Sequence, residues 1–277
     1  MHTTLKVRLS RVAGFALTAA MVFVVLLPAA GVSATKQEVK EFIAKIQNDN
    51  ADVRYAAWRA AGKIGAPAVA SLGELVVSKK QGVAKAASEA LNTIAHHASR
   101  PGAKAERKAV TRQFLRLLGR KKPHATRVKA LELLAVTGGD ECVPRVARLL
   151  NDKKLREDAR RALERVPGKA SLQALIEAVK KVPEEFRPAV IHSLGQKGAT
   201  EALDVLTDCA ESPNKAIALA AFEAMSRIGE VPSRDPQPVL DWEELSERAG
   251  VFIANAFLRF AEKRAAKGET EMALEIY

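Results

Sequence analysis

The stretch DVRYAAWRAAGKIG, residues 52–65, decides the fold, because its arrangement of residues returns several times along the 277-residue chain. Val53, Ala57, Ala61 and Ile64 are spaced three or four residues apart, which places them on one face of a helix. The charged residues of the stretch fall on the other faces. The stretch therefore predicts an amphipathic helix with a narrow face of small apolar side chains.

The same apolar face recurs in five later segments, which are residues 83–95, 126–138, 155–168, 186–198 and 217–229. The first position of the face falls at residues 53, 83, 126, 155, 186 and 217, in steps of 30, 43, 29, 31 and 31 residues. A shorter amphipathic stretch precedes each segment, and Gly, Pro, Asn or Asp marks the turns. Each unit is therefore predicted to be a helical hairpin.

The repetition also predicts how the hairpins assemble. One hairpin cannot bury its apolar face alone, so neighbouring hairpins must stack and share a continuous core. Alanine in the second helix of each hairpin lets successive layers approach closely. Strand patterns are lacking after Lys36. We therefore expect an all-α chain that forms an α-solenoid of about six hairpins over residues 35–230.

The motif Asp52-Val53-Arg54, followed by Ala57 and Gly62-Lys63-Ile64-Gly65, resembles the second helix of the HEAT-repeat family. The closest likeness is to its short-period branch, named after phycobilisome lyases, and it covers about residues 36–230. This resemblance implies a right-handed superhelix and a ladder of Asp and Arg between adjacent repeats. The acid of the ladder is clear at Asp52, with Asp152 a looser match. The structural repeat arginines are Arg54, Arg127, Arg156 and Arg187.

Residues 231–277 differ from the repeats before them. A proline-bearing connector, PSRDPQPVLDWEE, leads into a segment that resembles a tetratricopeptide repeat. That family's spacing is matched by Ala254, Phe257, Ala261, Gly268, Ala273 and Tyr277. The pattern predicts a tetratricopeptide-like hairpin that is truncated within its second helix; the alternative is a simple capping hairpin.

The first 34 residues predict an export signal. Basic residues precede an uncharged run from Val12 to Thr35, and Val32-Ser33-Ala34 offers the small residues that a signal peptidase requires. The strongly apolar part ends at Leu27, which is short for a membrane span of about 20 residues. We expect a cleaved signal and a periplasmic or extracellular protein. The alternative is an uncleaved membrane anchor with the same outward-facing domain.

The most unusual local feature is a basic segment between Arg100 and Lys129. It holds eleven Lys or Arg and one acid, Glu106, and it coincides with the long step of 43 residues. A spacing of four residues predicts a row of cations along one helix. The core-facing side of that helix is predicted to hold Val110, Phe114, Leu117 and Leu118. The candidate binding residues are Lys104, Lys108, Arg112, Arg116, Arg120, Lys121, Lys122, Arg127 and Lys129.

Two interpretations of the basic segment stay open: a solvated face, or a site for an anionic partner. HEAT-like alkylpurine DNA glycosylases give nucleic-acid binding a precedent in a similar fold. The export signal and the scarcity of aromatic residues near the row weigh against nucleic acid. Acidic lipid headgroups, an anionic polysaccharide or an acidic protein are the other candidates. Contact with a membrane is otherwise expected only through an uncleaved N-terminal segment.

Chemistry-bearing residues are sparse. The chain lacks the Gly-x-Ser-x-Gly, phosphate-loop and dinucleotide motifs, and it lacks the His-Glu pairs of HEAT-type deoxyhypusine hydroxylases. The two cysteines, Cys142 and Cys209, lie about two repeats apart, too far for a predicted disulfide. We expect no metal and no cofactor at the histidines in and around the repeats, which are His96, His97, His124 and His192.

These observations predict a non-catalytic scaffold that binds a protein partner, with the second helices lining the concave face of the solenoid. The first alternative is a protein that binds a polyanion, either nucleic acid or another acidic polymer, through residues 100–129. The second alternative is an enzyme that handles a bilin chromophore, as the name of the phycobilisome-lyase branch implies. The matched motif residues are packing positions and indicate no pigment site.

Overall fold

The structure, a computed structural model, describes residues 34–230, 232–234, 236 and 247–276. Within these ranges the chain forms helices and turns and contains no strand. The segment predicted to be an export signal lies outside the described residues, apart from Ala34. Among the described helices, none combines the length and apolar composition that spanning a bilayer requires.

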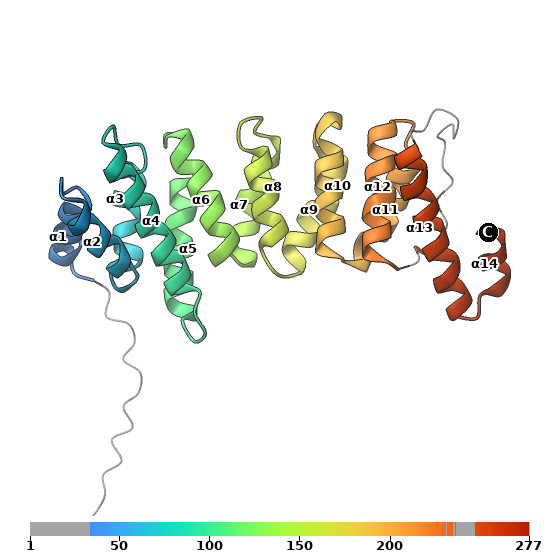
Figure 1. Ribbon diagram of the computed structural model, residues 1–277, viewed down its shortest axis with the longest axis horizontal. Helices are drawn as coiled ribbons and strands as arrows, with labels where there is room; N and C mark the ends of the chain where they lie inside the picture. Colours follow the sequence, from blue (N-terminus) through green and yellow to red (C-terminus); the bar gives the residue numbers. More distant parts are fainter. Residues whose placement is uncertain (1–33, 231, 235, 237–246, 277) are drawn as a thin grey trace, which may run out of the picture. The chain divides into compact units, whose positions relative to one another are not determined.

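Six helical hairpins follow one another along the chain (Figure 1). Their first helices are α1 (Lys36–Ile46), α3 (Val69–Leu75), α5 (Lys104–Leu117), α7 (Val143–Ala147), α9 (Lys169–Lys181) and α11 (Leu203–Ala210). Their second helices are α2 (Ala51–Ile64), α4 (Gln81–Ala98), α6 (His124–Thr137), α8 (Arg156–Arg165), α10 (Arg187–Lys197) and α12 (Lys215–Ile228). The predicted all-α solenoid of about six hairpins is therefore confirmed; its handedness stays a prediction.

Several units also contain short 3-10 segments. These are η1 (Ala66–Ala68), η2 (Asp140–Cys142), η3 (Arg148–Asn151), η4 (Glu184–Phe186) and η5 (Thr200–Ala202). The second helix begins at an asparagine cap in two hairpins: Asn50 Oδ1 accepts from the Asp52 N–H at 2.8 Å, and Asn214 Oδ1 accepts from the Ala216 N–H at 3.0 Å. These caps satisfy backbone donors that the first turn of a helix leaves free.

The core runs through the second helices, each of which contacts the second helix of the next hairpin. The second position of the repeated face is buried in all six units, at Ala57, Ala87, Ala130, Ala159, Val190 and Ala221. The third position is also buried in all six, at Ala61, Leu91, Leu134, Leu163, Leu194 and Met225. These two positions of the recurring apolar face are therefore buried in every unit, as the spacing predicts.

The long repeat step has a simple structural cause. Helix α4 has 18 residues, against 10–14 in the other second helices, and α5 has 14, against 5–13 in the other first helices. The extra residues lengthen the two helices around the turn at Ser99–Ala103 and add no further element. On α5, the residues predicted to face the core are buried as expected; they are Val110, Phe114, Leu117 and Leu118.

One close contact between hairpins depends on a glycine inside a helix. A Cβ atom placed on Gly195 of α10 would lie 2.8 Å from the Ala224 Cα and 3.0 Å from the Ala224 Cβ of α12. Real Cβ atoms do not approach backbone atoms this closely. Gly195 therefore sets how near α10 and α12 can pack, and Leu194 beside it fills the core.

A last hairpin follows the six repeats and consists of α13 (Glu247–Ala266) and α14 (Thr270–Ile276). Helix α13 contacts α12, and the Phe257 ring lies 5.5 Å from the Phe222 ring of α12. Of the residues that resemble a tetratricopeptide repeat, Ala261 and Ala273 are buried, Ala254 is exposed and Tyr277 lies outside the described residues. The hairpin is present; its assignment to that repeat family stays a prediction.

Candidate functional site

Four of the predicted binding residues form one exposed row on α5, here named the basic row: Lys104, Lys108, Arg112 and Arg116. Arg120 was expected to continue the row on the same helix, and this expectation is wrong. The Leu118 and Gly119 N–H groups bond back three residues, to the carbonyls of Leu115 and Arg116, and so close α5 before Arg120. Arg120 and Lys121 lie exposed in the following turn.

The one acid of the basic segment is already engaged. Glu106 accepts two hydrogen bonds from Arg100, at 2.7 and 2.8 Å, and its carboxylate lies 3.8 Å from His97 Nε2. The hydrogen bonds from Arg100 hold the pKa of the Glu106 carboxyl below its ordinary value. Glu106 therefore remains ionised and paired with Arg100, and it does not neutralise the basic row.

The remaining predicted binding residues are tied to carboxylates. Lys122 pairs with Glu74 of α3, and Arg127 pairs with Asp152 at 3.3 Å. Lys129 pairs with Glu132 on its own helix at 2.9 Å. The basic segment thus divides into exposed cations on α5 and its turn, and cations that hold hairpins or helices together. The nine predicted residues do not form one site.

The arginines of the predicted ladder lie near the starts of the second helices. Arg156 reaches Glu185 of the next hairpin at 3.0 Å, and its guanidinium lies 4.6 Å from the centre of the Phe186 ring. Arg127 reaches the next hairpin through Asp152, whereas the clearer acid, Asp52, has no ion pair within the described part of the chain.

The other two arginines act differently. Arg54 donates to the carbonyls of Asn48 and Asp49, within its own hairpin, at 2.7 and 2.8 Å. Its guanidinium occupies the space beside Gly82, where a Cβ atom would approach it to 2.7 Å. The Nε of Arg187 is buried and has no hydrogen-bond partner among the described residues. The expected Asp–Arg ladder is therefore replaced by varied contacts at the same turns.

A groove that the sequence reasoning missed lies between α2 and α4, the second helices of the first two hairpins. Its volume is about 630 Å³, and its lining includes Tyr55, Trp58, Lys85 and Glu89. Tyr55 is 51% exposed, and its ring meets that of Trp58 edge to face at 5.1 Å. Arg59 donates to the Tyr55 hydroxyl at 2.9 Å and lies 5.6 Å from the ring centre. Tyr55 and Trp58 both belong to the stretch 52–65 but lie outside its apolar face. Two aromatic residues outside the apolar face were the feature of the sequence that could have indicated this groove.

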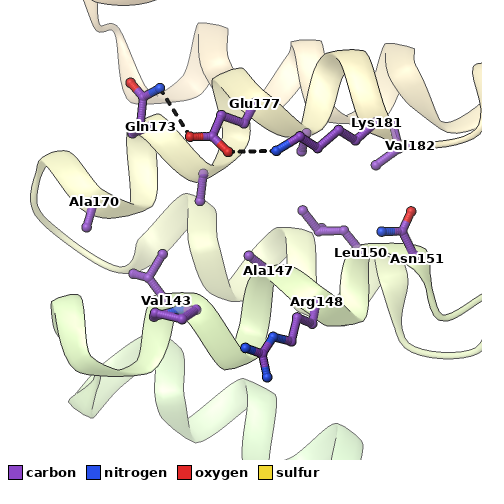
Figure 2. A pocket seen from close by; sticks show the side chains of 13 residues that line it. Val143, Ala147, Arg148, Leu150, Asn151, Ala170, Gln173, Glu177, Lys181 and Val182 are labelled. Atoms are coloured by element: carbon purple, nitrogen blue, oxygen red, sulfur yellow. Dashed lines mark hydrogen bonds and ion pairs between the residues drawn. The ribbon is translucent and has the colours of Figure 1, made fainter.

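A second groove, of about 470 Å³, lies between the first helices α7 and α9 (Figure 2). Its α9 wall carries Ala170, Ala174 and Ala178, whose small side chains leave the space open. Figure 2 shows Glu177 at the rim, held by Lys181 at 2.9 Å and by Gln173 at 3.5 Å. The charges at this rim are therefore mutually satisfied, and the groove presents mainly apolar surface.

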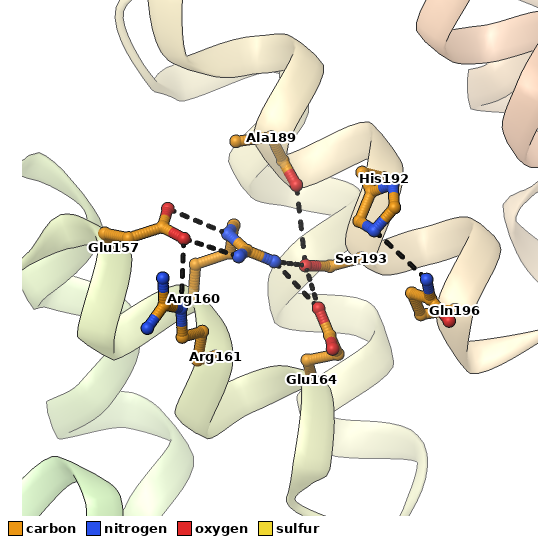
Figure 3. Close-up of polar contacts among 8 residues, drawn as sticks. All are labelled: Glu157, Arg160, Arg161, Glu164, Ala189, His192, Ser193 and Gln196. Carbon is orange, nitrogen blue, oxygen red and sulfur yellow. Dashed lines mark hydrogen bonds and ion pairs between the residues drawn. The ribbon is translucent and has the colours of Figure 1, made fainter.

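A buried polar cluster joins α8 to α10 (Figure 3). Arg160 is 8% exposed and binds Glu157 at 2.6 and 3.0 Å and Glu164 at 2.7 Å. It also donates to Ser193 of α10, whose hydroxyl donates to Glu164 at 2.7 Å. Hydrogen bonding from Arg160 lowers the pKa of Glu157. Burial opposes the charge of Arg160, but its hydrogen bonds with Glu157 and attraction to both carboxylates raise its pKa. The polar groups here satisfy one another, which indicates a structural clamp.

The remaining reactive side chains are dispersed. Within the described ranges, no three His, Cys, Asp or Glu side chains come together in a way that could hold a metal ion. Cys142 and Cys209 are free and buried, and burial raises the pKa of each thiol to about 11. A thiol with so high a pKa is a poor nucleophile at neutral pH. His192 contacts Gln196 on its own helix at 3.0 Å.

Comparisons with known proteins address the fold. The family model described as HEAT repeats matches residues 173–242. No curated protein matches the sequence significantly. A crystal structure of an engineered protein is similar at 18% identity with a TM-score of 0.39, covering 86% of this chain and 72% of that one. A second engineered protein is similar at 20% identity with a TM-score of 0.28, covering 86% of this chain and 95% of that one.

The two engineered structures have TM-scores too low to bear on the fold. The family match covers the hairpins that contain α10 and α12, which pack against each other through Gly195. The same hairpin, with the same buried positions, recurs in the four units that precede the match. The family match therefore identifies HEAT repeats at residues 173–242, within an array of similar hairpins.

Proposed function

We propose that this protein is a non-catalytic scaffold that binds a protein partner through the surface of its second helices. HEAT repeats stack into extended surfaces of the kind that bind other macromolecules. The observation that supports this surface most directly is the aromatic groove between α2 and α4. A polypeptide segment that crosses this groove would contact residues from two successive hairpins.

The residue types in the groove favour a protein partner. Tyr, Trp and Arg dominate the binding energy of protein interfaces; Tyr55 and Trp58 line this groove, and Arg59 contacts the Tyr55 ring. The chain has only two Tyr and two Trp, so one of each stands at this groove. The Arg59 hydrogen bond and the Trp58 edge already hold the Tyr55 ring in place. Because the ring is held before binding, less side-chain entropy is lost on association.

The test begins with chemical crosslinking of the purified chain to proteins of its host, followed by identification and purification of the crosslinked partner. Tyr55→Ala should weaken the affinity of that partner by about thirtyfold, the value expected for a central interface residue. The matched control is Val77→Ala, because Val77 is also exposed, at 43%, but lies in the turn after α3. Equal affinities for the Tyr55→Ala variant and the unchanged protein would contradict the proposal.

An exported location stays a prediction from residues 1–34, and it would place the partner outside the cytoplasm. N-terminal sequencing of the mature chain checks that prediction. A second candidate function, binding of an anionic partner through residues 100–129, is favoured by the exposed cations of the basic row. The bilin-handling enzyme is favoured by no described contact.

A further inference from the structure

The basic row is a continuous line of charge on one helix. Its four cations recur every four residues of α5, so each step advances about 6 Å and the whole row spans about 18 Å. The exposed residues of α5 between them are Ala105 and a further cation, Arg107, and the helix's one acid, Glu106, is held by Arg100. Arg120 and Lys121 extend the positive surface past the end of the helix.

The basic row is not arranged for helix stability. Lys104 is the first residue of α5, where the helix dipole disfavours a positive charge. Like charges four residues apart on a helix also repel each other. Among the described residues, none of the four cations forms an ion pair, and Arg116 alone contacts a polar side chain, Gln113 Oε1 at 3.3 Å. An anionic partner would relieve this repulsion.

We propose that the basic row binds an acidic segment of a protein partner in an extended conformation. In an extended chain, alternate side chains lie on the same side about 6.6 Å apart, close to the 6 Å step of the row. Carboxylates at every second residue of the segment would therefore meet successive cations. The inference rests on the proposed function, because it takes the ligand to be a protein.

Two features of α5 favour a peptide over other polyanions. Binding of single-stranded nucleic acid relies on exposed aromatic rings that stack on bases, and the one aromatic of α5, Phe114, is fully buried. Insertion into a membrane surface requires an exposed apolar face, and the apolar face of α5 packs into the core at Val110 and Leu117. The charged face of α5 thus lacks both the exposed aromatic rings that single-stranded nucleic acid requires and the exposed apolar surface that membrane insertion requires.

The probe is a fluorescein-labelled peptide of six Glu-Ser repeats, titrated with the full chain and followed by fluorescence anisotropy. We expect binding that weakens steeply between low and physiological salt. The variant K108E/R112E/R116E should bind at least about tenfold more weakly. The matched control is K40E/R145E/K169E, which changes the net charge equally at exposed positions on α1, α7 and α9. Its affinity should stay within about twofold of the unchanged chain.

Further measurements have outcomes that would contradict the proposal. A peptide with its six glutamates in one block should bind more weakly, and equal binding would overturn the extended register. Tighter binding of a 20-nucleotide single strand, or of phosphatidylserine vesicles, would assign the row to nucleic acid or lipid instead. Equal losses in the two triple variants would show general attraction to net charge. If the reversed variant does not fold, K108Q/R112Q/R116Q replaces it and should show a smaller loss than charge reversal.

The two proposals fail separately. Tyr55→Ala leaves α5 unchanged, so it should not alter affinity for the Glu-Ser peptide. If the unchanged chain does not bind the peptide, the proposed role of the basic row is wrong. The proposal for the groove between α2 and α4 then still stands. If the unchanged chain binds the peptide and Tyr55→Ala does not change the affinity for the crosslinked partner, only the proposed second-helix surface is wrong.

Discussion

At the scale of single residues, the hairpins depend on positions where almost no side chain fits. Gly195 is the clearest, because the backbone of Ala224 on the neighbouring helix occupies the space that a Cβ atom would need. Glycine inside a helix otherwise costs about 1 kcal/mol relative to alanine. At Gly195 the close approach of α10 and α12 offsets that cost, so its presence has a packing reason.

Replacement of Gly195 by alanine should therefore destabilise the protein by about 1–3 kcal/mol, because α10 and α12 must move apart. Gly250 of α13 provides the opposite case, since a Cβ atom there would meet nothing within 4 Å. Gly250→Ala should leave the free energy of unfolding unchanged or raise it by up to about 1 kcal/mol. Urea unfolding followed by circular dichroism measures both, and a stabilising Gly195→Ala would refute the packing argument.

At the scale of helices, polar contacts link one hairpin to the next at particular points. One of them is the Arg160 cluster, with Glu157, Glu164 and Ser193 around one guanidinium (Figure 3). Because Glu157 has a lowered pKa in the folded chain, its ion pair stabilises the fold above the ordinary carboxyl pKa of about 4.3. That contribution disappears as the pH falls through the lower, folded value.

Glu157→Gln should lower the free energy of unfolding by about 0.5–1 kcal/mol at pH 7, a modest value because the Glu157 side chain is 44% exposed. The difference from the unchanged chain should shrink once the pH falls below about 4.3 and then through the lowered pKa of Glu157 in the folded chain. Unfolding curves recorded from pH 7 down through this range measure this convergence. Glu201→Gln, at an exposed carboxyl with no ion pair in the described ranges, serves as the control. If the free energy of unfolding falls equally with pH in Glu157→Gln and in the unchanged chain, the ion pair between Glu157 and Arg160 does not stabilise the fold.

At the scale of the whole array, each interior second helix, from α4 to α10, contacts the second helix before it and the one after it. Stability in such an array is the sum of local terms, so damage to one hairpin reaches mainly its neighbours. The buried surface is shared between units, and no unit buries its face without the next. A defect in the middle should accordingly have a limited range.

Leu91 of α4 is fully buried, and its replacement by alanine should cost about 2–5 kcal/mol. Hydrogen exchange should show lost protection in α2, α4 and α6, which are in contact, while α10 and α12 keep theirs. Leu258→Ala, at a residue 45% exposed on α13, should change little. A uniform loss of protection across all hairpins would show that the array unfolds as one cooperative unit.

The repeated fold was predictable from the sequence because it depends on local spacing. The period of Ala57, Ala87 and Ala130 specifies both the helix face and its burial. The binding surfaces depend on contacts between distant residues, which spacing does not report. Lys122 and Arg120 are both basic residues of the same segment of the sequence. Lys122 nevertheless forms an ion pair with Glu74, 48 residues earlier, whereas Arg120 forms no ion pair within the described ranges.

The unequal lengths of the first helices explain how a repeat can gain a new property without losing its place in the array. A first helix as short as α3, with 7 residues, extends about 10 Å and has room for only two residues of a four-residue period. The 14 residues of α5 accommodate four. A long first helix, such as α5 or the 13-residue α9, thus has room for a row of outer side chains while its buried side still packs against the neighbouring hairpins.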